Sequence, residues 1–257
     1  MPLNERPGSQ RGPASFVFNQ RAFSNQPRLA FGEQAMTVQG TVNKSFLLLV
    51  VLLAGAFWTW SQYLTTNNPA AVALPMMAGF IGGLALYLAI LFRPTLATYL
   101  SIPYAACEGL LLGGISAQLE RRYPGIAIQA VGLTFAVLAA MLFAYKVGLI
   151  RVTQRFRMIV LGGLGAIMLL LLVSFVLNLF HVATPFLFNS TPLSLGISLL
   201  VIGFTAFSLA LNFDAIEAGV SMGVPRFMEW YSAFGLLVTL VTLYLWILQF
   251  LAQSQRR

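Results

Sequence analysis

The chain has 257 residues, of which 58% are apolar and 9% are charged, and its net charge at pH 7 is +8. Soluble domains carry roughly 25% charged residues, so this composition excludes an ordinary soluble protein and indicates that lipid surrounds most of the chain. The positive charge is explained by membrane topology and by contact with anionic lipid headgroups. We therefore expect the lipid bilayer, and no nucleic acid, among the partners.

The first 43 residues differ from the rest. They are rich in Pro, Gly, Gln, Asn and Arg, and no apolar core precedes a small-residue cleavage site, so they do not resemble a signal peptide. We expect residues 1–43 to be a disordered cytoplasmic tail. The membrane domain then covers residues 44–252, and residues 253–257 form a short C-terminal tail.

Seven apolar stretches follow the tail. Each can cross a hydrocarbon core of roughly 30 Å at about 1.5 Å per residue. They cover residues 45–64, 71–92, 96–117, 126–146, 157–180, 193–216 and 226–251. None alternates like a barrel strand, and helices satisfy every backbone group in lipid. The expected fold is an all-α, polytopic membrane bundle of seven transmembrane helices.

The distribution of Lys and Arg predicts the orientation. With a cytoplasmic N-terminus, eleven of the 15 Lys and Arg residues fall on the cytoplasmic side. The excess of positive charge in cytoplasmic segments therefore favours an N-terminus inside and a C-terminus outside.

Signatures of enzymes are scarce. The chain has one histidine, His181, and one cysteine, Cys107, which excludes an HExxH zinc site, an internal disulfide and a cysteine metal cluster. Neither a GxxxxGK[ST] loop nor a GxSxG motif occurs. We expect a protein that is not an enzyme and that carries no cofactor.

Two charges lie in or beside the second and third apolar stretches. Arg93 closes the second stretch just before Pro94. It either pairs with acidic residues across the bundle or extends to the lipid headgroups. Glu108 lies in the third stretch, where Gly109 and Gly113 form a GxxxG pair that predicts close packing against another helix.

Asp214 ends a run of 22 residues, 193–214, that contains no other charge. A carboxylate in this position is costly, which makes Asp214 the first candidate for a functional residue. One face of this stretch carries the small residues Gly196, Gly203, Ala206 and Ala210, and then Asp214 and Glu217. Small residues favour the close approach of another backbone. A second face carries the hydroxyl and amide residues Ser194, Ser198, Thr205, Ser208 and Asn212.

Glu229 lies early in the seventh stretch, after a turn that contains Gly223 and Pro225. In an antiparallel pair of helices, Asp214 and Glu229 would lie at similar depth. Together with Glu217 they form a predicted acidic cluster, which cannot ionise fully at low cost unless a cation or an arginine neutralises it. The cluster is predicted to bind a hard cation, to titrate, or both, with Asp214 and Glu229 as metal ligands. In the alternative interpretation, Glu217 and Glu229 are solvated at the headgroups.

Four segments carry a resemblance to a known family. They are MTVQGTVNKSFLLLVVLLAG at 36–55, YAACEGLLLGGIS at 104–116, LTFAVLAAMLFAYKVGLIRVTQRF at 133–156 and LNFDAIEAGVSMGVPRFMEWYSAFGLLVTLVTLYLWIL at 211–248. The chain resembles the Bax inhibitor-1/YccA family of bacterial membrane proteins over about residues 36–250. The resemblance implies six helices around a central C-terminal helix. It also implies similarity to pH-sensitive calcium leak channels.

In those relatives, acids on the last two helices sense protons and an arginine of the second helix holds the pore closed. Asp214 matches the acid of the sixth helix. The relatives' second acid lies deeper in the seventh helix, where this chain is apolar around residues 234–238, so Glu229 is the nearest substitute. Arg93 corresponds to the arginine by helix and depth.

The sequence thus predicts a multi-pass protein of the bacterial inner membrane that passes Ca²⁺, or else H⁺, with ion-binding or gating residues Asp214, Glu229, Glu217, Arg93 and Glu108. The rival interpretation is a non-conducting regulator that binds other membrane proteins, such as a membrane-bound AAA protease. A regulator should depend on residues 1–43 and tolerate a neutral residue at position 214.

Overall fold

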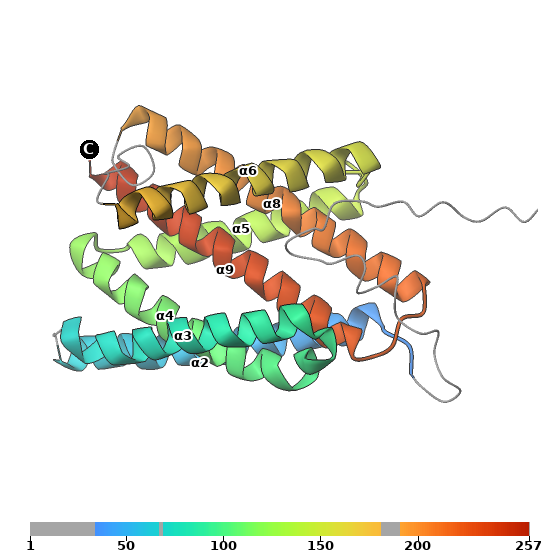
Figure 1. Cartoon of the computed structure of the whole chain (residues 1–257), viewed down its shortest axis with the longest axis horizontal. Coiled ribbons are helices and arrows are strands. Elements are labelled where there is room, and N and C mark those ends of the chain that lie inside the picture. Colours follow the sequence, from blue (N-terminus) through green and yellow to red (C-terminus); the bar gives the residue numbers. More distant parts are fainter. Residues whose placement is uncertain (1–33, 67–68, 181–190, 257) are drawn as a thin grey trace, which may run out of the picture.

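The computed structural model describes residues 34–66, 69–180 and 191–256. These residues form seven long α-helices and one short 3₁₀ helix (Figure 1). The elements are α2 (Val38–Thr66), α3 (Pro69–Phe92), η1 (Pro94–Leu96), α4 (Ala97–Arg122), α5 (Ile126–Lys146), α6 (Gln154–Leu179), α8 (Pro192–Ser221) and α9 (Met228–Gln255). All seven long helices contain a stretch long and apolar enough to cross a membrane, which confirms the predicted fold class. His181 and the tail up to residue 33 lie outside the described residues.

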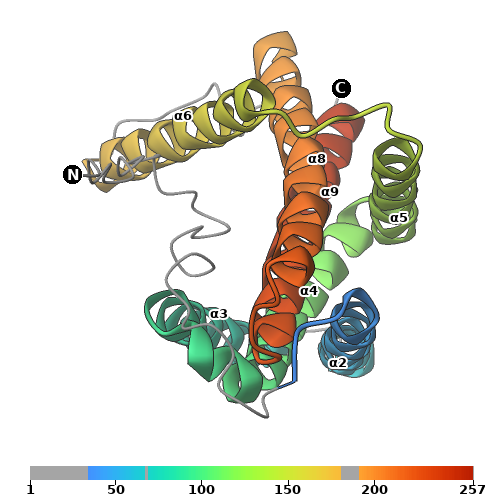
Figure 2. The same ribbon diagram turned by 90° about the vertical axis from the view of Figure 1, so that its right-hand side faces the viewer.

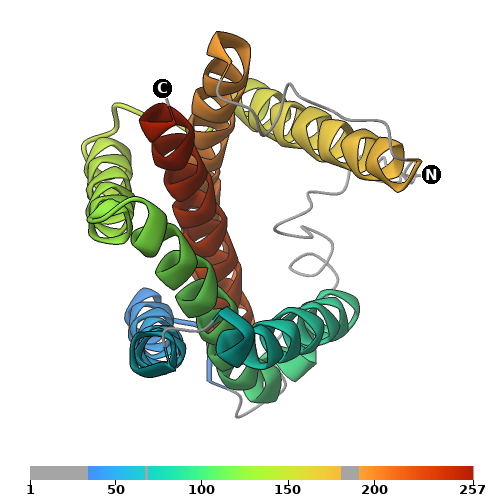
Figure 3. The ribbon, with the colours of Figure 1, turned by 90° about the vertical axis from the view of Figure 1, so that its left-hand side faces the viewer.

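Helix α9 runs between two groups of helices (Figures 1 and 2). On one side α4 packs against both α2 and α3, and on the other side α8 packs against α5 and α6. Helix α9 packs mainly against α8, α2, α5 and α4. Helices α3 and α6 lie further from α9 and are held chiefly by α4 and α8 (Figure 3). The predicted ring of six helices around the last helix is therefore not established, because α9 packs mainly against four of them.

The closest helix contact involves the GxxxG pair of α4. A Cβ atom on Gly109 would collide with the carbonyl oxygen of Leu52, and one on Gly113 would collide with that of Ala56. Only glycine lets the two backbones approach this closely. The predicted tight packing of this face is confirmed, with α2 as the neighbour.

The interface between α8 and α9 contains a column of buried polar side chains, which we call the polar seam. The Asn212 side-chain amide donates a hydrogen bond to Thr239 Oγ1 at 2.8 Å, and the Ser198 hydroxyl donates to Gln253 Oε1 at 3.0 Å. Its buried members are Ser194, Ser198, Thr205, Ser208, Asn212, Ser232, Thr239 and Gln253. The two hydrogen bonds across the interface help to hold α8 and α9 together, because apolar contact alone gives little preference for another helix over lipid.

The small-residue face of α8 behaves differently from the prediction. Among the described residues, a Cβ atom on Gly196 or Gly203 would meet nothing within 4 Å, so no described backbone lies close to these glycines. The expectation of close packing on this face is wrong there. The hydroxyl face meets α9 instead, where Ser198 and Asn212 have hydrogen-bond partners in Gln253 and Thr239.

The first and last helices extend beyond the predicted limits of residues 44–252. Helix α2 begins at Val38, within the segment assigned to the tail, and α9 continues to Gln255. Thr37 caps α2, because its hydroxyl oxygen accepts a hydrogen bond from the Gly40 amide at 3.0 Å. At the other end, Gln253 is buried in the polar seam, which keeps the last turn of α9 helical.

Candidate functional site

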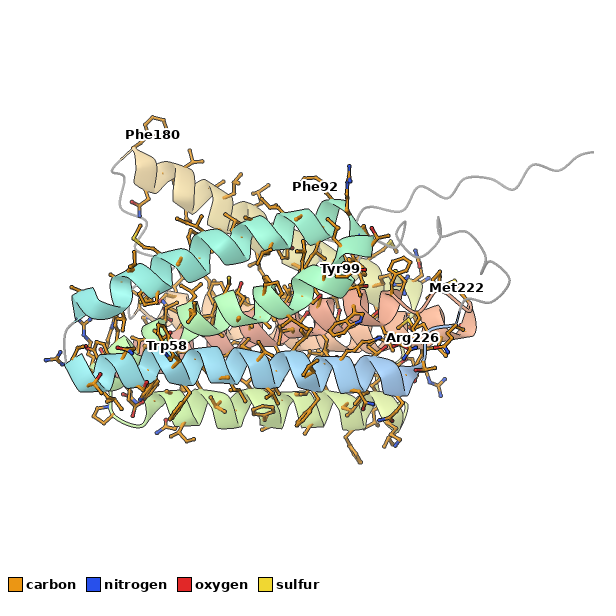
Figure 4. All side chains as sticks on the ribbon, turned by 90° about the horizontal axis from the view of Figure 1, so that it is seen from below. Trp58, Phe92, Tyr99, Phe180, Met222 and Arg226 are labelled. Atoms are coloured by element: carbon orange, nitrogen blue, oxygen red, sulfur yellow. The ribbon has the colours of Figure 1, made fainter. Side chains whose placement is uncertain are left out.

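Most of the candidate site residues lie at one end of the bundle, where α2, α6 and α9 begin and α5 and α8 end. We call this the charged end. In Figure 4 it is marked by Met222 and Arg226, whereas Phe180 marks the opposite end. Gly223 has a φ of 63°, which allows the tight turn between α8 and α9.

Glu229 is the buried carboxylate of this end, with 2% of its surface exposed. It forms an ion pair with Lys44 of α2. Its other neighbours are the Thr37 amide and hydroxyl, which both donate to Oε1 at 2.9 Å, and Arg226, whose Nε lies 3.9 Å from Oε2. We call Glu229, Lys44, Thr37 and Arg226 the Glu229 cluster. A buried carboxylate with this many donors remains charged at low cost.

The Glu229 cluster also fixes the chain before α2. The Met36 amide donates to the Val224 carbonyl at 2.8 Å, and the Arg226 amide donates to the Gln34 carbonyl at 3.0 Å. An isolated antiparallel bridge joins Ala35 to Pro225. Residues 34–37 are therefore paired with the α8–α9 turn, which is why part of the expected tail is ordered.

Asp214 is paired with a residue of α6. Its Oδ2 lies 2.6 Å from Arg157 Nη2, and the two side chains are 28% and 25% exposed. Nearby, the rings of Phe156 and Phe207 meet edge to face with centroids 5.7 Å apart. Because α6 packs mainly against α8, this ion pair and these rings hold α6 in place.

Glu217 lies one turn further along α8 and is exposed. It accepts a hydrogen bond from the Tyr145 hydroxyl of α5 at 2.7 Å. Tyr145 also interacts electrostatically with the Asp214 carboxylate. The end of α8 is thus joined to α6 through Asp214 and to α5 through Glu217.

The structure does not bring the three acids into one cluster. Asp214 and Glu217 have partners on α6 and α5, whereas Glu229 is turned toward α2. Among the described residues, no group of three or more His, Cys, Asp and Glu side chains could hold a metal ion. The alternative interpretation, in which Glu217 and Glu229 are solvated, fits the exposed Glu217 but not Glu229, which is more buried than Asp214.

The structure pairs Asp214 with Arg157 and not with Arg93, so the first of the two alternatives for Arg93, pairing with the acids, is not seen among the described residues. Arg93 lies exposed between α3 and η1, and it forms no ion pair with any residue that the structure describes. Glu108 is separate from the charged end. It interacts with Tyr104 and faces α3, where a Cβ atom on Gly83 would lie 3.5 Å from Glu108 Oε1.

Sequence reasoning missed Lys44 and Arg157 as partners of the acids. One signal for Lys44 was present, since a lysine at the start of an apolar stretch is costly without a counter-ion. Arg157 had no comparable signal, because Arg151, Arg155 and Arg157 precede or begin the same apolar stretch and the spacing does not say which of them reaches α8.

A comparison with family models decides the relationship of the chain. The model described as Bax inhibitor 1 like matches residues 15–256. The chain belongs to the Bax inhibitor 1-like family. No curated protein and no solved structure matches it. Membership in the Bax inhibitor 1-like family agrees with the seven apolar helices, and the chain is a multi-pass membrane protein.

Proposed function

We propose that this Bax inhibitor 1-like protein is a pH-sensitive cation leak channel or transporter, with Ca²⁺ as the transported ion, and that it is not an enzyme. The observation that carries the proposal is the partly exposed ion pair of Asp214 and Arg157 between α8 and α6. We propose that this ion pair stabilises the closed state of the protein.

The exposure of the pair suits a reversible contact. Ion pairs in contact with water contribute roughly 0.2–1 kcal/mol, which is small enough for protonation of one carboxylate to change the balance between two states. Asp214 faces Arg157 of α6 and Tyr145 of α5, and Glu217 lies on the same helix. Loss of the Asp214 charge would remove the attraction to Arg157 and free α8 from α6.

The polar seam between α8 and α9 is the proposed path of the ion. Its side chains are buried in this structure, so the path is closed. Release of α8 from α6 lets α8 move relative to α9, and the hydroxyl and amide oxygens of the seam then become available to a hard cation. The Glu229 cluster holds the beginning of α9 against α2 while this happens.

The proposed location is the bacterial inner membrane, with the charged end in the cytoplasm. Among the described residues, seven Lys and Arg lie at the charged end and three at the other end. An excess of positive charge on one side supports a cytoplasmic N-terminus.

Calcium flux into proteoliposomes tests the proposal. Asp214→Asn and Arg157→Gln each remove one partner of the pair, so both should raise the resting leak. Arg155→Gln is the matched control, because Arg155 is exposed two residues earlier and forms no ion pair within the described part of the chain. If all proteins, the wild type included, give no more flux than empty liposomes, the non-conducting regulator of membrane proteins is the better account.

A further inference from the structure

A cavity of about 540 Å³ lies between α2, α4, α5 and α9. Its volume falls within the roughly 300–1,000 Å³ of typical ligand pockets. It lies away from the charged end, because its lining includes the end of α4 at Glu120 and the beginning of α5 at Ala127. None of the residues of the Asp214–Arg157 pair or of the Glu229 cluster lines it.

The cavity has a buried floor and an exposed rim. Leu112 of α4 and Leu237 of α9 are buried in the floor. Phe57 of α2 is 75% exposed and Ile128 of α5 is 73% exposed, and both line the same cavity. Helices α2 and α5 lie on the same side of the bundle (Figures 2 and 4). The cavity therefore opens sideways between α2 and α5, toward the hydrocarbon of the bilayer.

The hydroxyl and carboxyl side chains of the lining already have partners. Ser116 and Tyr244 share a hydrogen bond at 2.7 Å, and the Thr134 hydroxyl donates to the Ala130 carbonyl at 2.7 Å. Glu120 accepts hydrogen bonds from the backbone amides of Gly125 and Ala127, at 2.6 and 3.0 Å. Ordered water needs two to four polar partners, and a polar ligand needs unoccupied ones. The cavity is thus suited to an apolar occupant.

We propose that the cavity binds one acyl chain of a bilayer phospholipid. The lining on α2 extends from Leu49 to Trp60, which is roughly 16 Å at 1.5 Å per residue. This length is about half of a hydrocarbon core of roughly 30 Å, so it matches the acyl chains of one leaflet. Trp60 and the cations Arg121 and Arg122 in the last turn of α4 place the headgroup at the end opposite the charged end.

Retention of lipid by purified protein tests this proposal independently of ion flux. Val131 lines the cavity, whereas Leu133 lies on the same helix, is exposed and does not line it. Native mass spectrometry of detergent-purified wild type should show one retained phospholipid. Val131→Phe should lower this retention by about tenfold, because the added ring occupies the cavity, and Leu133→Phe should leave it unchanged. Equal retention in both variants, no retention in the wild type, or retention of a free fatty acid instead contradicts the proposal.

Fluorescence quenching in vesicles provides a second test. Two proteins would each keep one tryptophan, either Trp60 in the lining or Trp58 on the exposed surface of α2. Vesicles of phosphatidylcholine with increasing fractions of brominated acyl chains then quench each tryptophan. A single bound chain should quench Trp60 in linear proportion to the brominated fraction, because one site is occupied by brominated chains at their mole fraction. Trp58, which several lipid chains surround, should follow a steeper and curved dependence. Identical curves would show that Trp60 meets only the lipid that surrounds the protein.

Discussion

The Glu229 cluster predicts a large and specific loss of stability. Glu229→Ala leaves Lys44 without a counter-ion and the Thr37 amide without its acceptor. Removing one partner of a buried pair costs about 3–5 kcal/mol. The Lys44 side chain is 15% exposed and reaches some water, so we expect the lower limit, about 3 kcal/mol. Glu229→Gln keeps an acceptor for Thr37 and loses only the charge, for which about 1.5–3 kcal/mol is expected.

Thermal unfolding in detergent measures this difference. For a chain of this size, 1 kcal/mol corresponds to a change of roughly 2–4 °C in Tm, so Glu229→Ala should lower Tm by about 6–12 °C. The matched control is Glu217→Ala, which removes an exposed carboxylate with a single hydrogen bond to Tyr145 and should lower Tm by less than about 4 °C. The double variant Lys44→Met with Glu229→Gln should lose less than the sum of the two single variants. Equal effects of Glu229→Ala and Glu217→Ala would refute the argument that burial makes the pair costly to break.

Three further outcomes follow from the packing and the charges. Gly113→Ala should destabilise the protein by about 1–3 kcal/mol because its Cβ would collide with α2, whereas Gly203→Ala, with open space around it, should be neutral or slightly stabilising in the same unfolding assay. Asn212→Leu should cost about 0.6–1.7 kcal/mol, because it removes the hydrogen bond to Thr239. Calcium flux should depend on pH in the wild type and less so in Asp214→Asn; an unchanged pH curve in this variant would exclude Asp214 as the sensor.

The fold could be predicted from the sequence because hydropathy acts locally. A stretch such as residues 126–146 is long and apolar enough to require a helix in lipid, and α5 has these bounds. The GxxxG pair of Gly109 and Gly113 likewise predicts close packing, since only the missing side chain permits it. The GxxxG pattern does not indicate which helix packs against it, and the structure shows that this helix is α2.

The candidate site was harder to predict, because pairing of charges depends on where the helices lie. Asp214 was identified from its position at the end of a charge-free run, but its partner comes from α6 and not from α3. Glu229 was predicted to lie near Asp214 only because both residues would lie at a similar depth in the membrane. The rotation of α9, which depends on its packing against α2 and α8, turns Glu229 toward Lys44 instead.

The central claim is that the Asp214–Arg157 pair holds the closed state, and a charge exchange tests it most directly. Calcium leak would be measured in proteoliposomes for Asp214→Arg, for Arg157→Asp and for the variant with both changes. Each single change places two like charges together and should raise the leak. The double change restores an ion pair of opposite polarity and should return the leak toward the wild-type level. A double variant that leaks as much as the single variants, or single variants that do not leak, would contradict the account.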